Sequence, residues 1–251
     1  MSGHSKWANI QHEKGAADAK RGQAFTKLSR EIIMASKEGG PEPDMNARLR
    51  LAIQKAKDAR MPADNIERAI KKGSGQLEGE TMVELNLEGY GPGGVAVLVQ
   101  AVSDNRNRTV ADVRHQFTRS GGAMGEAGCV SWIFESKGSI ILKTDGKDPD
   151  ELTLEAIDAG ADDVKQEEDI LEVITAPDQM EKVRKALEAK KLNVQSANIE
   201  KHPKTQVELN EETALQVLKL LSTLEDMDDV QNVYSNADFD PAVVAKFAAA
   251  S

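Results

Sequence analysis

The sequence contains few of the residues that build disulfides, zinc sites and base-stacking surfaces. Its 251 residues include one cysteine, Cys129, and four histidines. A single cysteine cannot form an internal disulfide, and the histidines lack the spacing of a structural zinc site. Aromatic residues make up 4% of the chain, too little for a sheet that stacks bases on clustered rings. We therefore expect no metal, and we expect any nucleic acid to be bound through its backbone charge.

Long apolar segments are also missing. No stretch approaches the length needed to cross a bilayer, and residues 1–7 contain no apolar core of a secretion signal. With 39% hydrophobic and 29% charged residues, the composition is that of an ordinary globular protein. We expect a cytoplasmic monomer with no membrane partner.

Groupings typical of catalysis are absent as well. His115 and Cys129 lack the spacing of a nucleophile and its base, and acidic runs such as residues 225–229 lack the spacing of a calcium loop, so we expect them to be solvated. Gly89–Gly94 matches the letters G-x-G-x-x-G, but a strand follows where a dinucleotide site requires a helix, which favours a hairpin turn. The sequence predicts no enzyme, no catalytic residue and no cofactor.

What the chain does have is an uneven distribution of charge. The net charge is −10, yet residues 1–75 hold 15 Lys and Arg against 9 Asp and Glu, while the remainder holds 17 against 33. A polyphosphate responds to the local potential, which clustered cations set within a Debye length. The sequence therefore indicates a basic N-terminal end that contacts phosphate.

Residues 1–77 are predicted to form a basic leader and a three-helix domain. Apolar residues at helical spacing predict a helix over residues 16–37, a second one capped by Asp44, and a third from Pro62 to a C-cap at Gly73. The predicted buried stripe of the second helix consists of Met45, Leu49, Ala52, Ile53 and Ala56.

From residue 81 the pattern predicts strands and helices. Val83, Leu85 and Leu87 alternate with polar residues, which predicts a half-buried strand with Glu88 facing outward. Further strands are expected over residues 95–102 and 130–134. Residues 138–202 follow the order strand, helix, strand twice over, which is typical of a ferredoxin-like domain.

The predicted fold class is α+β with several domains. A helical N-terminal three-helix domain precedes two α/β, ferredoxin-like domains, and the third domain is inserted in the second because a late helix and strand would complete the sheet begun at residue 81. The expected boundaries are 1–77 for the leader and helical domain, 78–137 with 205–240 for the discontinuous α/β domain, 138–204 for the inserted domain and 241–251 for a C-terminal tail.

The leader and first helix contain the first group of candidate nucleic-acid-binding residues. A lysine-rich helix face is normally only solvated, but the leader has too little apolar content to order itself. Its tryptophan either stacks on a bound partner or packs on the helical domain. The group consists of Lys6, Trp7, His12, Lys14, Lys20, Arg21, Lys27 and Arg30.

Arg106 and Arg108 form the second candidate group. They lie in residues 104–109, next to the start of a predicted helix, where cations oppose the helix dipole at a cost of roughly 0.3–1 kcal/mol each. An anion would favour them there. The alternative is a solvated arginine pair near Asp104.

Several stretches together resemble one known family. The most specific are Gly3-His4-Ser5-Lys6-Trp7-Ala8-Asn9-Ile10 with His12 and Lys14; Arg21 with Phe25, Lys27 and Leu28; residues 61–73; Gly89–Gly94; and residues 104–109. Over essentially its whole length the chain resembles the YebC family of bacterial and organellar regulators, which includes a mitochondrial translational activator of cytochrome c oxidase subunit I. The resemblance implies a helical N-terminal domain and two α/β domains, the third inserted in the second.

The resemblance also implies a function. It points to a non-enzymatic, nucleic-acid-binding regulator of gene expression, a type of protein labelled in this family as a probable DNA-binding transcriptional regulator. The alternative is a ribosome-associated translation factor that binds ribosomal RNA and relieves stalling at consecutive prolines. No helix-turn-helix with side chains aimed at base edges is identifiable in the helical domain, so DNA and ribosomal RNA both stay open as partners.

Overall fold

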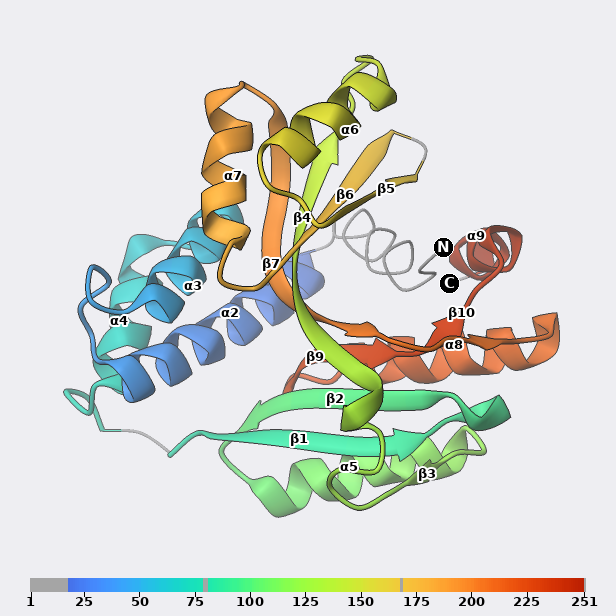
Figure 1. The fold of residues 1–251 in the computed structure, drawn as a ribbon. Helices are drawn as coiled ribbons and strands as arrows, with labels where there is room; N and C mark the ends of the chain where they lie inside the picture. Colours follow the sequence, from blue (N-terminus) through green and yellow to red (C-terminus); the bar gives the residue numbers. More distant parts are fainter. Residues whose placement is uncertain (1–17, 79–80, 168, 251) are drawn as a thin grey trace.

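The computed structural model describes residues 18–78, 81–167 and 169–250 and shows a helical unit beside two sheet-containing units. In Figure 1 the N-terminal helices lie at the left, one sheet unit lies at the bottom and the other at the top. The predicted α+β class, with an N-terminal helical part and two sheet domains, is confirmed. The exact domain boundaries stay predictions.

Three helices form the N-terminal unit: α2 (Asp18–Gly39), α3 (Ala47–Asp58) and α4 (Ala63–Gly73). Their apolar faces enclose a core that includes Ile32, Leu49 and Ile66. Met82 and Val102, which belong to the next unit, complete this core. The helical unit is therefore held to the second unit by shared hydrophobic burial.

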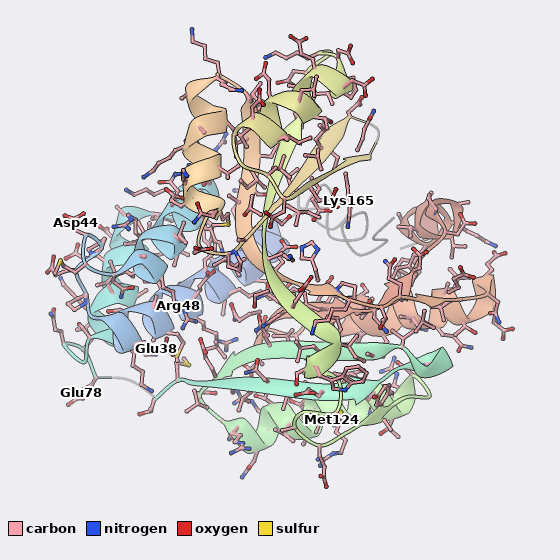
Figure 2. All side chains as sticks on the ribbon, viewed as in Figure 1. Glu38, Asp44, Arg48, Glu78, Met124 and Lys165 are labelled. Atoms are coloured by element: carbon pink, nitrogen blue, oxygen red, sulfur yellow. The ribbon has the colours of Figure 1, made fainter. Side chains whose placement is uncertain are left out.

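The start of α3 differs from the prediction. Asn46, and not Asp44, is the N-cap: its Oδ1 accepts a hydrogen bond from the N–H of Leu49 at 3.0 Å. Its Nδ2 donates to the carbonyl of Ala35 on α2 at 2.7 Å. Asp44 lies in the exposed turn before the helix (Figure 2). Met45 is in the same turn and is 87% exposed, so its place in the buried stripe was wrong.

Gly73 ends α4 without serving as its C-cap, which is Ser74. The prediction of a glycine C-cap was therefore wrong at this position. A Cβ on Gly73 would lie 2.3 Å from the carbonyl oxygen of Ile33 on α2. Glycine is required here because α4 approaches the backbone of α2 too closely for a side chain.

The second unit is discontinuous in sequence. Its first part consists of β1 (Val83–Tyr90), β2 (Ala96–Ser103), α5 (Arg106–Arg119) and β3 (Ala123–Met124). The short 3-10 helix η1 (Pro92–Gly94) joins β1 to β2, so a hairpin follows β1. The late strand β9 (Val230–Ser235) pairs with β2 and gives the antiparallel order β3-β1-β2-β9.

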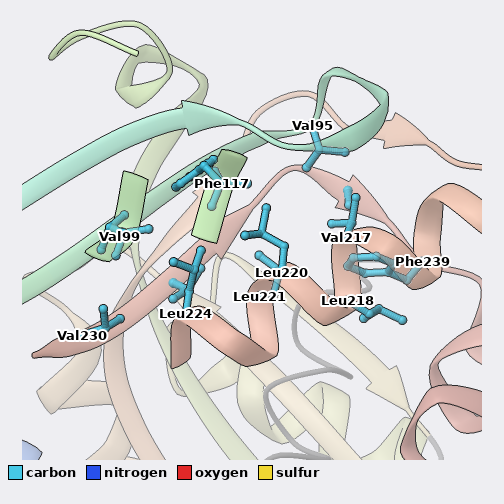
Figure 3. Close-up of a cluster of buried hydrophobic side chains, with 14 of the residues drawn as sticks. Val95, Val99, Phe117, Val217, Leu218, Leu220, Leu221, Leu224, Val230 and Phe239 are labelled. Atoms are coloured by element: carbon cyan, nitrogen blue, oxygen red, sulfur yellow. The ribbon is translucent and has the colours of Figure 1, made fainter. Parts of the chain in front are cut away.

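The core of this unit lies between the sheet and the helices α5 and α8 (Glu211–Glu225). Figure 3 shows Phe117 from α5 and Leu220 and Leu224 from α8 meeting Val99 of β2. These four side chains are fully buried. The long-range pairing of β9 and the packing of α8 close the unit around its inserted segment.

The inserted unit has the predicted ferredoxin-like topology. Its strand order is β5-β6-β4-β7, and every neighbouring pair is antiparallel. Two helices cover one face of the sheet over a core that includes Ile140, Val173 and Leu187. The elements are β4 (Phe134–Lys143), α6 (Pro149–Asp158), β5 (Asp163–Glu167), β6 (Ile170–Thr175), α7 (Met180–Ala189) and β7 (Asn193–Pro203).

Glu88 is buried, contrary to the alternation that placed it outward. Burial raises the pKa of this carboxyl, but backbone hydrogen bonds outweigh that effect and the pKa is lowered overall. The strand predicted over residues 130–134 was also wrong, because this segment turns through η2 (Ser131–Ile133) to reach the carboxylate. The donors are the N–H groups of Gly128, Val130 and Ser131, at 2.7–2.8 Å.

The C-terminal residues, expected to be a tail, include the helix α9 (Pro241–Ala250). Val243 and Val244 bury it in the core of the second unit. The short parallel strands β8 (Val207–Glu208) and β10 (Ala237–Asp238) pair beside it. None of the helices in the described part of the chain is long and apolar enough to span a membrane.

Candidate nucleic-acid interface

Half of the candidate residues have no described side chain. Lys6, Trp7, His12 and Lys14 lie outside the described residues, and Lys20 belongs to α2 without a described side chain. The described candidates are Arg21, Lys27 and Arg30 on α2, and Arg106 and Arg108 on α5.

The described basic face of α2 lies against the acidic loop, which we define as residues 225–229 between α8 and β9. Lys27 Nζ donates to the carbonyl oxygen of Glu225 at 2.6 Å, and Arg30 donates to that of Asp228. Burial lowers the pKa of Lys27, although the carboxylates of the loop oppose this effect. Both cations therefore hold α2 against the second unit, and the acidic loop is not simply solvated.

Asp229 is the centre of a buried polar network at this contact. Its Oδ1 accepts from Arg30 Nη2 at 2.8 Å, and its Oδ2 accepts from Arg108 Nη2 at 3.1 Å. The hydroxyls of Ser103 and Thr109 donate to the same Oδ2 at 3.0 and 2.5 Å. Burial raises the pKa of Asp229, but the hydrogen bonds from Thr109, Arg108 and Ser103 lower it further, so the carboxylate stays charged.

The two arginines of the second group have different surroundings. Arg108 also pairs with Asp104 at 2.7 Å, so two carboxylates hold its guanidinium. Arg106 is exposed in the first turn of α5, and within the described residues it has neither a hydrogen bond nor an ion pair. Of the pair, Arg106 is the one available to an external anion.

Further cations on the helical unit are held by neighbours. Arg48 pairs with Glu38 and Glu84, which links α3 to α2 and to β1; Figure 2 shows Arg48 beside Glu38. Lys55 pairs with Glu31 at 2.9 Å. Because of these ion pairs, only some of the cations in the basic N-terminal end are available to bind a partner.

Three other cations were not among the candidates. Lys57 on α3, Arg60 in the loop after it and Arg68 on α4 are exposed, and no partner for them exists among the described side chains. Their signal in the sequence was their position outside the apolar stripes. They extend the available positive surface along α3 and α4.

Cys129 does not resemble an activated nucleophile. Burial raises the pKa of its thiol, and the nearby Glu88 raises it further. A thiol of raised pKa is mostly protonated at neutral pH, and the thiolate is the nucleophilic form. Cys129 is therefore a poor catalytic candidate.

Comparisons with known proteins agree over nearly the whole chain. Two family models match: "TACO1/YebC protein N-terminal domain" over residues 5–76 and "TACO1/YebC second and third domain" over residues 82–237. A protein from Dehalococcoides mccartyi named probable transcriptional regulatory protein is 69% identical over 247 residues, which cover 98% of this chain and 98% of that protein. A protein of the same name from Geobacter sulfurreducens is 57% identical over 238 residues, which cover 95% of this chain and 96% of that protein.

A solved structure is also similar. The crystal structure of a conserved hypothetical protein from Aquifex aeolicus matches with a TM-score of 0.83 at 49% identity, covering 89% of this chain and 92% of that chain. The two proteins are therefore similar both in sequence and in fold. The chain belongs to the TACO1/YebC family.

Proposed function

We propose that the protein is a cytoplasmic, non-enzymatic regulator of gene expression that binds the phosphate backbone of nucleic acid at its N-terminal end. Relatives named probable transcriptional regulatory protein support the regulatory role. The observation that carries the proposal is a group of exposed cations on the helical unit and in the first turn of α5 that have no described partner, in a chain of net charge −10. These cations are Lys57, Arg60, Arg68 and Arg106.

The proposed surface combines these cations with the N-terminal candidates. Lys6, Trp7, His12, Lys14, Lys20 and Arg21 supply the leader and the start of α2. Lys27, Arg30 and Arg108 contribute in a different way, because the acidic loop occupies them. They fix the position of the helical unit and reach phosphate directly only when the loop is displaced.

The nucleic acid itself is identified by crosslinking in cells followed by sequencing, with parallel sedimentation against ribosomes. Discrete promoter DNA without co-sedimentation supports the transcriptional role. Enriched ribosomal RNA with co-sedimentation supports the alternative, a translation factor that relieves stalling at proline stretches. Recovery of neither DNA nor RNA would contradict the proposed function.

Arg106→Ala tests the surface at one described residue. Loss of one phosphate contact should reduce the slope of log affinity against log salt by about one unit, because one counterion fewer is released. Melting temperature should not change, since no described residue bonds this side chain. The measurement is fluorescence anisotropy with duplex DNA and a ribosomal RNA fragment across a salt series.

The matched control is Lys147→Ala, which removes an exposed cation from the inserted unit. The slope of log affinity against log salt should be the same for Lys147→Ala as for the wild type. Equal slopes for the wild type and Arg106→Ala would show that Arg106 is not part of the proposed nucleic-acid-binding surface.

A further inference from the structure

The open face of the inserted sheet brings two glutamates and a histidine together. Along β6, Leu171 and Val173 enter the core beneath the helices, so Glu172 between them faces the opposite side. On β7, Glu200 and His202 are two residues apart and pair with Lys137 and Glu135 of β4. Strand alternation therefore places all three side chains on the face that α6 and α7 do not cover.

The three side chains present their polar atoms to one another. One carboxylate oxygen from each of Glu172 and Glu200 and one imidazole nitrogen of His202 lie within 4.8 Å of each other. His202 Nε2 is 3.8 Å from Glu172 Oε1, and the two side chains are 12% and 3% exposed. Nε2 is inaccessible to solvent and has no hydrogen-bond partner among the described residues.

Several neighbours act on this cluster. Lys55 of α3 acts on Glu200, and its Nζ is also bound to Glu31 at 2.9 Å, while Lys165 and Lys137 act on His202. The Ser139 hydroxyl donates to Glu172 Oε1 at 3.0 Å, which orients that carboxylate. His202 Nε2 has no hydrogen-bond partner among the described residues, which is costly for a buried nitrogen, and a bound metal ion would supply one.

We propose that Glu172, Glu200 and His202 bind a divalent transition-metal ion, with Zn²⁺ or Mn²⁺ as the fitting class. Two carboxylate oxygens and one imidazole nitrogen suit these ions, whereas a site with no thiolate and one nitrogen does not select copper(I) or calcium. Ligand atoms bound at about 2.0–2.2 Å stand roughly 3 Å apart, so small side-chain rotations close the site from its present spacing. Water fills the remaining coordination positions.

Hydrogen bonding around the cluster fits this role. A metal-bound carboxylate is usually oriented by a hydrogen bond from a neighbouring group, and Ser139 supplies one to Glu172. The ion would also lie near Lys55 of the helical unit, whose charge acts on Glu200, and near Tyr234 of β9, whose pKa is raised by burial and then by Glu200. Metal binding would therefore stabilise the junction of the three units.

The test is isothermal titration of the full-length, chelator-treated protein with Zn²⁺ and with Mn²⁺. We expect one ion per chain, a higher melting temperature with metal, and at least tenfold weaker binding in His202→Gln and in Glu200→Gln. The matched control, His115→Gln, removes the exposed histidine of α5 and should bind as the wild type does. Circular dichroism verifies that each variant is folded.

Two results would overturn the proposal: the absence of one-to-one binding in the wild type, or equal weakening by His115→Gln and His202→Gln. A second measurement needs no variant. Crystals of the wild type soaked in Mn²⁺ should show an anomalous peak between the three side chains, and a peak only elsewhere, or none, would contradict the site.

Discussion

At the scale of single residues, Asp229 connects parts of the chain that are distant in sequence. Its carboxylate binds Arg30 from α2 and Arg108 from α5, while Ser103 at the end of β2 donates a further hydrogen bond. Hydrogen bonds to a charged group contribute more than neutral ones, about 1.5–3 kcal/mol each. The helical unit is thus oriented by one buried charge as well as by apolar packing.

Asp229→Asn should lower the free energy of unfolding by roughly 2 kcal/mol, because the amide keeps the shape but loses the charge that holds two arginines. Urea unfolding measures the change. The control is Asp228→Asn, since the hydrogen bond from α2 goes to the backbone carbonyl of Asp228 and its side chain is exposed. Equal effects of the two substitutions would show that the network does not depend on the Asp229 charge.

The same residue predicts a pH dependence. Hydrogen bonds from Thr109, Arg108 and Ser103 outweigh burial and lower the pKa of Asp229, so its stabilisation is present above the unfolded pKa, about 3.9. It is lost as the pH falls through the lower folded pKa. The wild type should therefore lose more stability than Asp229→Asn between pH 5 and the acid limit of folding, as followed by thermal melts. Parallel pH curves for the two proteins would contradict this assignment.

The sequence identified Lys27, Arg30 and Arg108 as cations outside the apolar stripes, but it could not show what they contact. Their partners in the acidic loop lie 121 to 199 residues away along the chain, the largest separation being that of Arg30 and Asp229 (229 − 30 = 199). Helical periodicity describes one element at a time and contains no information on which loop covers its polar face. For this reason the residue types were predictable and their intramolecular role was not.

At the scale of elements, periodicity predicted most helices and strands, and the errors lie where tertiary contacts decide. Asp44 and Asn46 are both good N-caps, and the bond from Asn46 to the Ala35 carbonyl selects the second. Glu88 follows the polar phase of β1, yet the backbone N–H groups of residues 128–131 hold its carboxylate inside the structure. Both outcomes depend on atoms that a single element does not contain.

Gly73→Ala should destabilise the protein by roughly 1–3 kcal/mol, because its Cβ would meet the Ile33 carbonyl and separate α4 from α2. Gly22→Ala is the matched control: it lies inside α2, no described atom is within 4 Å of its Cβ, and it should stabilise by about 0.5–1 kcal/mol. Thermal melts measure both. Stabilisation by both substitutions would contradict the proposed close approach.

At the scale of the whole molecule, the excess of positive charge near the N-terminus and the excess of negative charge in the rest of the chain meet where α2 contacts the acidic loop. Part of the basic face of α2 is paired with the acidic loop, while other cations of the helical end have no described partner. The count of charges predicted a basic end but not this division between structural and available cations. Long-range burial decides it, since Met82 and Val102 bring the second unit onto the helical core.

The central claim is that the N-terminal end binds nucleic-acid phosphate. Its most direct test replaces Lys6, Lys14 and Lys20 together by Ala and measures affinity for duplex DNA and a ribosomal RNA fragment across a salt series. The slope of log affinity against log salt should fall by up to about one unit per lost contact. The control replaces Lys143, Lys147 and Lys182, exposed on the inserted unit, and should keep the wild-type slope. An unchanged slope in the N-terminal variant would contradict the claim.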